Sequence, residues 1–442
     1  MNQKVNIFLI TIDCLRADFF NLITFNESLT PNLSKFMREG IYFSETFANG
    51  PTTRNSFPSI LSSTYTLMYP SFFKELSEYR VSIPKILKHH KYTTIGVNFN
   101  AFLSRFYNYN KGFDIYYDVL SRTPLSFEKI IRYFYFFIKK TFFKKILNYL
   151  TLKDRLHESA KKVNKIVLST LRKCNQPFFV WIHYMDSHFP YYPPKKYRKY
   201  GVYETKMLNK IVKNNPSRVS DFNFKKIIDL YKGTLKYIDF ELGKFFGKLK
   251  ALGLYNNSLF IITADHGDEF KEHGDFSHTA KLYDELLHVP LIIRGPRIPK
   301  NKIVDHIVSL LDISPTILDY LQIAKNDEFK GFSLIPLFYD DISSYNRIGV
   351  ISEVLVKEPF YRMVSYRTKE WKYIINEKTN KKELYHLIKD RNENNNIYNL
   401  NKDLAKKFEE KIKLHKDMEL RMHKQINEMK SIKNVIKKIK FS

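Results

Sequence analysis

Short apolar runs alternate with polar, glycine-containing turns along this chain, and the clearest example is Leu259–Glu269, which reads LFIITADHGDE. The apolar or β-branched residues Leu259 to Thr263 predict a buried strand. The sequence ADHG then breaks that pattern at the strand's carboxyl end, where α/β folds place their chemistry. We expect Asp265 and His266 to offer an oxygen and an imidazole nitrogen to one divalent cation. The alternative is an ordinary strand followed by a solvated turn.

A second run of this kind, Val5–Ile12, delivers Asp13 at its carboxyl end. Because one parallel sheet brings the carboxyl ends of its strands to the same edge, we expect Asp13 and Asp265 to meet there. An aspartate in this place is also a common helix N-cap. Both interpretations of Asp13 stay open from the residues alone.

Further periodic stretches predict the rest of an α/β fold. Strands are expected at Thr93–Asn98, Phe178–His183, Val289–Arg294 and Ile348–Glu353, and an antiparallel hairpin is expected from Glu370. Helices are expected at Leu33–Met37, Ser82–Lys88, Ser56–Ser62, Phe224–Leu252 and from Val308, and Gly40 and Gly253 are the stops of two of them.

The stretch Phe47–Ser63 presents Thr52 and Thr53 after a Gly-Pro turn and before the expected helix. A hydroxyl at a helix N-terminus lies where backbone N–H groups and the helix dipole stabilise an attacking oxygen and a bound anion. Threonine and serine hydroxyls also cap helices. Catalysis and capping therefore both remain possible for Thr52, Thr53 and Ser56.

Several histidines follow predicted strands. His183 and His188 lie at the exit of the strand Phe178–His183, where each can either line a polar site or be structural. The loop after His266 is polar, contains glycine and carries His273 and His278, which is typical of a site lining.

Two lysine-rich stretches have no clear place in the core. In Phe127–Leu152, aromatic residues alternate with lysine pairs, which suits a helix on an anionic membrane or a hydrophobic substrate. The alternative is a helical insertion packed on the core with its lysines reaching to solvent. Lys402–Ser442 is expected to be a helix without strong hydrophobic spacing, exposed and partly mobile.

Composition narrows the class of protein. Hydrophobic residues make up 44% and aromatic residues 16% of 442 residues, which predicts a globular chain. The net charge of +28 comes mostly from scattered lysines without a nucleic-acid-binding motif, so nucleic acid is not expected as the main partner. Anionic substrates or anionic membrane surfaces fit this charge.

Cysteine usage and hydropathy bear on location. Cys14 and Cys174 have no disulfide-framework or zinc-type spacing, and a reducing compartment is the simplest interpretation. Val5–Ile12 is short and ends in charged residues without a cleavage site, so it is not a secretory signal. No apolar run approaches the length of a bilayer span. We expect a cytoplasmic protein that is soluble or peripheral at a membrane.

Several blocks occur in an order that resembles the sulfatase family of the alkaline phosphatase superfamily. They cover the chain from Asn6 to about Leu400 and read TIDCLRAD, GPTTRNSFPSILSS, HYMDSHFPY, TADHGDEFKEHGDFSHTAKLYDELLHVPLII, LLDISPT, WKYI and ELYHL. The resemblance implies an alkaline-phosphatase-like α/β fold, with a doubly wound mixed sheet flanked by helices and a smaller C-terminal antiparallel-sheet subdomain. It divides the chain into a catalytic domain, 1–340, with a helical insertion at 120–170, a subdomain at 341–400 and a lysine-rich helical tail at 401–442.

The resemblance also implies a metal site. Asp13, Asp265 and His266 match metal ligands, and Thr53 matches the nucleophile, which also touches the metal. Cys14 stands where family members often have a second aspartate. The set suits one divalent ion, with Mn²⁺, Mg²⁺ or Zn²⁺ at least as suitable as Ca²⁺.

The nucleophile block departs from the sulfatase motif. Thr53 stands where sulfatases mature a cysteine or serine to formylglycine, and Phe57 replaces the motif's arginine. Because threonine cannot give that aldehyde, it would act as a metal-activated alkoxide that forms a covalent ester. His188 and His278 match positions that line the anion site, and Lys281 is expected to assist them.

The function expected from this resemblance is a metal-dependent hydrolase of sulfate or phosphate esters that acts on an anionic small-molecule or glycan ester. The alternative is a phosphoglycerol- or phosphoethanolamine-type transferase, or a phosphodiesterase, acting on a glycan or lipid-linked acceptor. A catalytically silent scaffold or nucleic-acid binder is a third class, and the retained residues Asp13, Thr53, Asp265, His266 and His278 argue against it.

Overall fold

The structure is a computed structural model that describes residues 4–20, 23–24, 27–70, 75–119, 158–214, 216, 219–357 and 360–439. The chain divides into two compact units, each assembled from three segments of sequence. The first unit comprises Met1–Tyr42, Pro84–Ser277 and Pro290–Ile303, and the second comprises Phe43–Ile83, His278–Val289 and Val304–Ser442. The predicted helix at Phe127–Leu152 lies outside the described residues. The domain boundaries at 340 and 400 remain a prediction.

The first unit contains a mixed sheet with the strand order β11-β8-β1-β7-β5-β6. Neighbouring strands from β8 to β6 are parallel, and β11 is antiparallel to β8. Every residue of β1, β7 and β8 is buried, as expected for parallel strands covered on both faces. The bounds are β1 Asn6–Ile12, β5 Thr93–Val97, β6 Ile115–Tyr117, β7 Phe178–Tyr184, β8 Ser258–Ala264 and β11 His288–Arg294.

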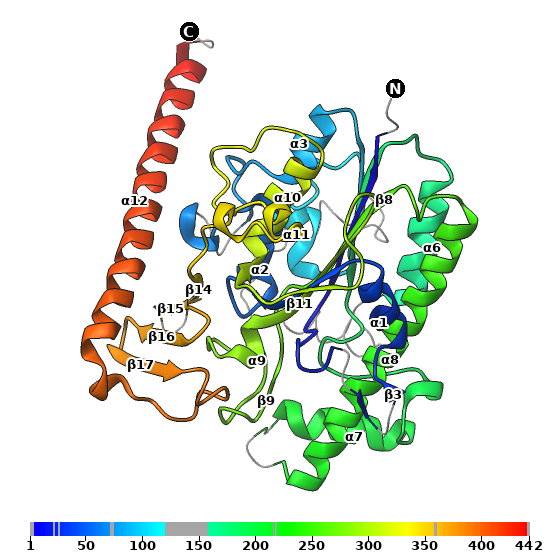
Figure 1. Cartoon of the computed structure of the whole chain (residues 1–442), viewed down its shortest axis with the longest axis horizontal. Coiled ribbons are helices and arrows are strands. Elements are labelled where there is room, and N and C mark those ends of the chain that lie inside the picture. The colour runs from blue at the N-terminus through cyan, green and yellow to red at the C-terminus, as the bar shows by residue number, and fades with distance from the viewer. Residues whose placement is uncertain are drawn as a thin grey trace. The chain divides into compact units, whose positions relative to one another are not determined.

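Helices flank this sheet, and α6 contacts β5 and β7 directly. The helices that belong wholly or mostly to the first unit are α1 Pro31–Arg38, α3 Ile83–His89, α6 Ala160–Leu171, α7 Val202–Asn214 and α8 Asp221–Ala251, and Figure 1 shows α6 and α8 side by side. Phe246 of α8 stacks on Phe36 of α1 and meets Phe260 of β8 edge-on, with ring centroids 4.7 and 5.9 Å away. These contacts bury the apolar face of α8 against β8, the strand that leads into Asp265 and His266. The predicted α/β fold with a mixed sheet and flanking helices is confirmed.

The second unit contains the antiparallel sheet β14-β15-β16-β17, which confirms the predicted C-terminal sheet and its hairpin. Its strands are β14 Val350–Lys357, β15 Phe360–Arg367, β16 Trp371–Asn376 and β17 Lys381–His386. In the same unit, α2 (Thr53–Ser62) packs on α10 (Ile313–Tyr320). The helix predicted from Val308 begins later, because Val308 and Ser309 form β13, which pairs with β4 (Ile41–Phe47).

The remaining short strands and α-helices of the two units are β2 Ile23–Thr24, β3 Glu27–Ser28, β9 Glu269–Phe270, β10 Phe276–Ser277, β12 Lys302–Val304, α9 Asp284–Leu287 and α11 Ile335–Phe338.

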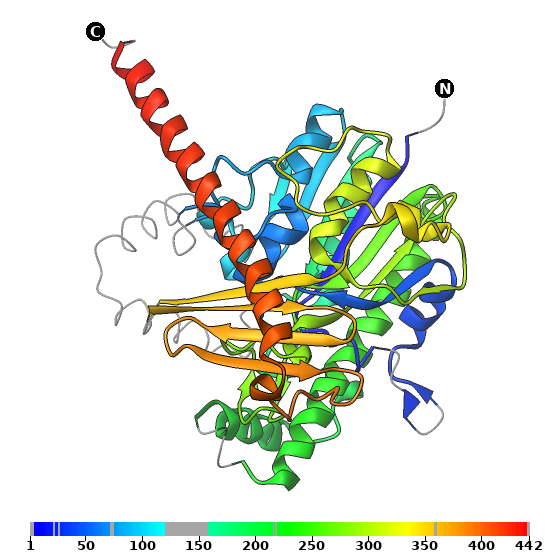
Figure 2. The same ribbon diagram turned by 60° about the vertical axis from the view of Figure 1, so that its left-hand side comes forward.

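The C-terminal helix α12 (Lys402–Ile439) corrects the expectation of an exposed tail. Figure 2 shows it crossing the antiparallel sheet. Its buried residues recur at steps of three and four and join a cluster that includes Val364 and Tyr373 of the sheet. The buried positions of α12 are Ala405, Phe408, Ile412, His415, Glu419 and Ile426. Two of them are polar, which is why the sequence showed no strong hydrophobic spacing.

Among the described residues, none of the helices combines the length and the apolar character that a membrane span requires.

Candidate metal and catalytic site

Strand register brings the two predicted carboxylates together. Ile12 of β1 pairs with Ala264 of β8, so the residues that follow them, Asp13 and Asp265, leave neighbouring strands at the same edge of the sheet. Both side chains are fully buried. The sequence predicted that these two carboxylates meet at one edge of the sheet, and the strand register agrees with that prediction.

The Asp13 carboxylate is surrounded by polar groups of the first unit. Its Oδ1 accepts a hydrogen bond from the Cys14 thiol at 2.9 Å, and its Oδ2 accepts one from Asn100 Nδ2 at 3.2 Å. His183 Nε2 lies 3.1 Å from the same Oδ2. Burial alone would raise the pKa of Asp13, but the charge of nearby His188 and the hydrogen bond and charge of His183 hold that pKa well below its ordinary value. Asp13 is therefore ionised.

The Asp265-His266 pair contributes a second carboxylate and an oriented imidazole. His266 Nε2 lies 3.5 Å from Asp265 Oδ2 and 3.8 Å from Asp13 Oδ1. Its other nitrogen, Nδ1, is 2.8 Å from the carbonyl oxygen of Gly267. Because a carbonyl only accepts, Nδ1 carries the proton and Nε2 presents its lone pair toward the carboxylates. This is the tautomer that a metal-binding histidine needs.

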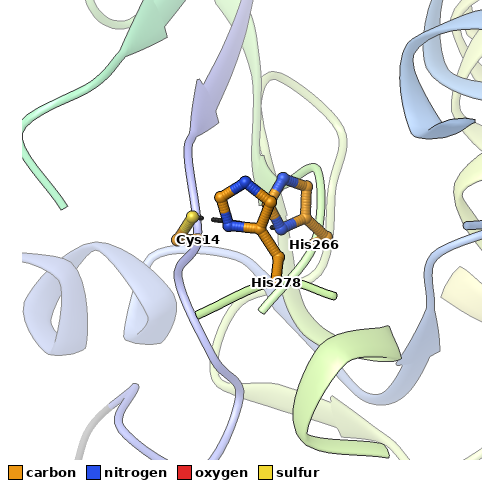
Figure 3. Close-up of side chains that lie close together, drawn as sticks. All are labelled: Cys14, His266 and His278. Atoms are coloured by element: carbon orange, nitrogen blue, oxygen red, sulfur yellow. Dashed lines mark hydrogen bonds between the residues drawn. The ribbon is translucent and has the colours of Figure 1, made fainter. Parts of the chain in front are cut away.

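Cys14 stays a neutral thiol beside this pair. Figure 3 shows its sulfur next to the ring of His266, with 3.9 Å between Sγ and Nδ1. Burial raises the pKa of the Cys14 thiol well above its ordinary value, and the carboxylates of Asp13, Asp268 and Asp265 raise it further. The residue thus serves as an S–H donor to Asp13 in the described geometry.

These donors fit a divalent metal. One ligand atom from each of Asp13, His183 and Asp265 lies within 4.8 Å of the others, and all three residues are buried. Carboxylates buried side by side without a cation would be costly. Carboxylate oxygen and imidazole nitrogen together suit Mn²⁺, Zn²⁺ or Mg²⁺. Sequence reasoning considered His183 for a polar site but did not include it among the ligands.

Two more residues of the first unit lie at the same edge. The Ser187 hydroxyl donates to the Asp13 carbonyl oxygen at 2.5 Å. His188 is half-buried, and its positive charge makes the largest contribution that lowers the pKa of Asp13. The role expected of His188 in lining the anion site stays a prediction.

The loop after Gly267 is held by buried acceptors. Asp268 accepts from Tyr191 Oη at 2.7 Å, and Glu269 Oε1 accepts from the backbone N–H of His273 and of Asp275 at 3.0 and 2.7 Å. Arg16 Nη1 donates to the Asp268 carbonyl oxygen at 2.9 Å. The sequence analysis did not identify Arg16 as part of the site. Its position three residues after Asp13 is the feature of the sequence that could have indicated it.

The remaining candidates belong to the second unit. Thr53 is the first residue of α2 and is buried, with 4% of its surface exposed. Within the described part of the chain, Thr52 occupies the N-cap position but makes no cap hydrogen bond, and its hydroxyl donates instead to Asn55 Oδ1 at 2.5 Å. The capping interpretation is therefore wrong for Thr52. His278 and Lys281 are half-buried in the segment that precedes α9.

Phe57, which replaces the arginine of the sulfatase motif, is fully buried in α2. It is a core residue of this helix, and the aligned motif position therefore carries no cationic group here.

Comparison with known proteins identifies the family. A family described as Sulfatase matches residues 5–323. This chain belongs to the sulfatase family. A second family, described as N-sulphoglucosamine sulphohydrolase, C-terminal, matches residues 271–435 of this sulfatase-family chain.

Individual relatives cover part of the chain. Arylsulfatase K of Bos taurus is 31% identical over 168 residues, which are 37% of this chain and 31% of that protein. An arylsulfatase of Clostridium perfringens is 28% identical over 214 residues, 43% of this chain and 44% of that protein. The chain thus spans less than half the length of these curated relatives.

Solved structures match over almost the whole chain. The phosphonate monoester hydrolase of Agrobacterium radiobacter superimposes with a TM-score of 0.72 at 16% identity, over 94% of this chain and 96% of that one. A protein in complex with its substrate D-glucosamine-2-N,6-O-disulfate gives a TM-score of 0.73 at 16% identity, over 95% and 99%. At these identities the likeness shows the shared fold.

Proposed function

We propose that this sulfatase-family chain is a metal-dependent hydrolase of sulfate or phosphate esters in which Thr53 is the nucleophile. The observation that carries the proposal is the buried arrangement of Asp13, Asp265 and His266 at the carboxyl ends of β1 and β8. The arylsulfatases among the relatives and the phosphonate monoester hydrolase among the structures support this class of reaction.

Each candidate residue has a role in this proposal. Asp13, Asp265 and His266 hold the divalent ion, together with the hydroxyl of Thr53. The ion, when bound, acts as a Lewis acid that favours ionisation of a hydroxyl and polarises an ester oxygen. His188 and His278 neutralise charge on the group being transferred and protonate the leaving oxygen, and Lys281 assists them.

The reaction proceeds in two displacements. Thr53 Oγ1 releases its proton to solvent and forms a bond to the sulfur or phosphorus, while the bond to the leaving oxygen breaks and that oxygen takes up a proton from His188 or His278. Water then attacks the same sulfur or phosphorus and gives a proton back to that histidine. The bond to Thr53 Oγ1 breaks, Oγ1 takes up a proton from solvent, and sulfate or phosphate is released. No aldehyde is needed, which agrees with threonine at this position.

The substrate class follows from charge and from the relatives. The chain carries a net charge of +28, which favours anionic esters through long-range attraction. One structural relative binds a sulfated glucosamine. We propose an anionic small-molecule or glycan ester as the substrate.

The test uses purified full-length protein from which metal has been removed with a chelator. Mn²⁺, Mg²⁺, Ca²⁺ and Zn²⁺ are added singly, and turnover of aryl sulfate, aryl phosphate and aryl phosphodiester is measured for the wild type and for Asp265→Asn. We expect metal-restored cleavage of the sulfate or the phosphate monoester, and loss of that cleavage in the variant. Cleavage of the diester alone would replace the proposal with a phosphodiesterase. Absence of turnover with every metal and ester would overturn it.

A further inference from the structure

We infer that His183 is an additional ligand of the metal, so that the centre has two imidazole nitrogens and prefers Mn²⁺ or Zn²⁺ to Ca²⁺. The inference rests on the metal dependence proposed above and adds a residue and a metal preference to it.

The fold fixes His183 beside Asp13. His183 belongs to β7, and its Cα partner across the parallel pairing with β1 is Thr11. The side chain is fully buried, and it points to the same face of the sheet as Thr11. Because His183 is part of a central strand, its ring has little freedom to move away from the carboxylate.

The surroundings of Thr11 select the tautomer of His183. The Thr11 hydroxyl oxygen lies 3.1 Å from Trp181 Nε1, 3.2 Å from the Ile182 carbonyl oxygen and 2.8 Å from His183 Nδ1. The indole N–H only donates and the carbonyl only accepts, so the single hydroxyl proton goes to Ile182. All three contacts are then hydrogen bonds if His183 Nδ1 carries a proton and donates it to Thr11.

With Nδ1 turned to Thr11, Nε2 is the ring nitrogen that faces Asp13 Oδ2, 3.1 Å away. A proton on Nε2 makes the hydrogen bond to Asp13 described above, and a metal bound to both atoms would replace that proton. Two ligands at right angles around an ion, each about 2.1 Å from it, lie about 3.0 Å apart. The observed separation therefore suits two neighbouring ligands of one ion.

His266 repeats the arrangement on the other side of Asp13. Its Nδ1 donates to a backbone carbonyl and its Nε2 faces Asp13 and Asp265. Both histidines are thus oriented through Nδ1 by a neighbouring oxygen, which is how proteins fix metal-binding imidazoles.

The donor types set the metal preference. Calcium takes six to eight oxygen ligands, whereas imidazole suits zinc, and manganese accepts carboxylates with fewer ligands than calcium requires. Cys14, which follows Asp13, places its sulfur 2.9 Å from Asp13 Oδ1. Two imidazoles and two carboxylates with this thiol nearby form a set that is poor for Ca²⁺.

The first measurement counts the imidazole ligands directly. Full-length protein labelled with ¹⁵N at histidine is freed of metal and loaded with Mn²⁺, and pulsed electron paramagnetic resonance counts the imidazole nitrogens coupled to the ion. We expect two in the wild type and one in each of His183→Ala and His266→Ala. A wild type with a single coupled imidazole, or a His183→Ala protein that keeps both, would overturn the inference.

Titration calorimetry provides the second measurement. Thr11→Val removes the hydroxyl that orients His183, whereas Thr11→Ser keeps it and serves as the matched control. We expect Thr11→Val to weaken Mn²⁺ binding roughly 10- to 100-fold, as for other outer partners of metal ligands, and Thr11→Ser to bind like the wild type. Circular dichroism confirms that each variant is folded. Equal affinities of the two variants, or tighter binding of Ca²⁺ than of Mn²⁺ by the wild type, would overturn the inference.

These results separate the inference from the proposed function. Two coupled imidazoles without turnover of any ester would support the ligand assignment and reject the hydrolase. Metal-dependent turnover with one coupled imidazole would do the reverse.

Discussion

Asp13 and Asp265 occupy equivalent positions one residue beyond two neighbouring parallel strands, because Ile12 pairs with Ala264 in the register of β1 and β8. Both carboxylates are fully buried. The sheet itself therefore sets their separation, and no mobile loop is needed to bring them together. A site built in this way is already formed before a metal binds.

The first prediction follows from the burial of these carboxylates. Asp265→Asn keeps the side-chain volume but removes a charge, so it should abolish tight Mn²⁺ binding and turnover. Without metal, the same variant should be more stable than the wild type, because one of two adjacent buried charges is gone. Thermal unfolding with and without Mn²⁺ checks both statements: the wild type should melt higher than the variant only when the metal is present. A variant that gains as much stability from Mn²⁺ as the wild type would contradict the assignment.

The second prediction concerns Thr53. Thr53→Ala should lower turnover by at least about 1,000-fold, since a covalent mechanism cannot proceed without its nucleophile. Thr53→Ser keeps a hydroxyl at the same place and should retain measurable turnover. Rates on the best aryl ester, with circular dichroism as the check on folding, distinguish the two variants. If alanine and serine behave alike, Thr53 has no nucleophilic role.

The sequence was most informative where burial is complete. The strands β1, β7 and β8 are buried at every position, so their uninterrupted apolar runs predicted both the strands and the polar residues that follow them. The order of the sequence blocks that resemble sulfatases then predicted the fold, which the separate strand and helix patterns do not determine by themselves.

Elements with mixed surroundings were harder to predict. The strand β15 exposes its first residues, and its apolar and polar positions do not alternate cleanly. In α12 the buried stripe is interrupted by His415 and Glu419, whose partners lie on distant strands. The role of Thr11 beside His183 depends on which residues pair across β1 and β7, and register of this kind cannot be read from either strand by itself.

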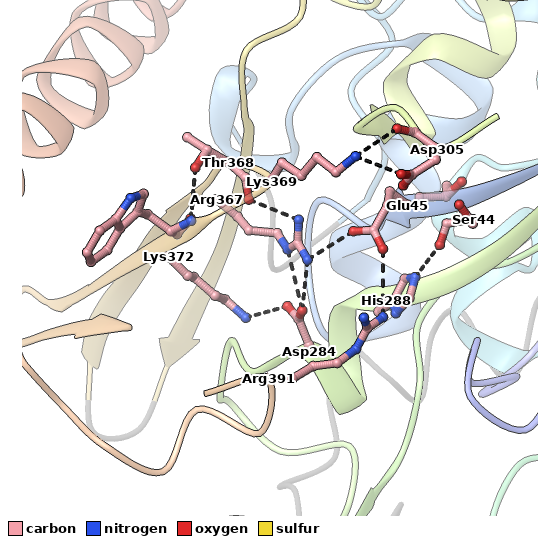
Figure 4. A network of polar contacts seen from close by, with 12 residues as sticks. Ser44, Glu45, Asp284, His288, Asp305, Arg367, Thr368, Lys369, Lys372 and Arg391 are labelled. Carbon is pink, nitrogen blue, oxygen red and sulfur yellow. Dashed lines mark hydrogen bonds and ion pairs between the residues drawn. The ribbon is translucent and has the colours of Figure 1, made fainter. Parts of the chain in front are cut away.

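The third prediction concerns a buried lysine of the second unit. Lys372 Nζ lies 2.8 Å from Asp284 Oδ1 (Figure 4). It also lies 2.8 Å from Glu393 Oε1, and its side chain is fully buried. Burial, followed by the charge of Asp284, raises the pKa of Glu393 to about 7 in spite of the lysine. Lys372→Met should lower the free energy of unfolding by about 3–5 kcal/mol, because it leaves the buried Glu393 without its cation and Asp284 with Arg367 alone.

The same network offers a matched control. Lys369 Nζ is 2.7 Å from Asp305 Oδ2, but both side chains are more than half exposed. Lys369→Met should therefore cost less than about 1 kcal/mol. Urea unfolding of the two variants measures the difference, and equal costs would mean that the burial of Lys372 does not matter for stability.

The fourth prediction concerns pH and the docking of α12. His415 Nε2 lies 3.2 Å from Glu353 Oε2 and 3.2 Å from Glu419 Oε1, and Arg362 bonds to both carboxylates. Burial lowers the pKa of His415, but its hydrogen bonds to the two glutamates outweigh burial and raise the pKa to about 9. Because the folded pKa lies above the ordinary value of 6.5, the histidine's contribution to stability is complete below pH 6.5 and is lost as the pH rises through about 9.

The size of that loss follows from the shift. It corresponds to about 3.5 kcal/mol as an upper value, since each pKa unit is worth about 1.4 kcal/mol. Urea unfolding of the wild type should give a falling free energy between about pH 6.5 and 9.5, and His415→Gln should show a flatter profile, because glutamine keeps a hydrogen-bonding amide but does not titrate. Glu393, whose pKa is about 7, also titrates in this range, but it does so in both proteins, so the difference between the two profiles isolates the histidine. Parallel profiles would show that protonated His415 does not hold α12 on the sheet.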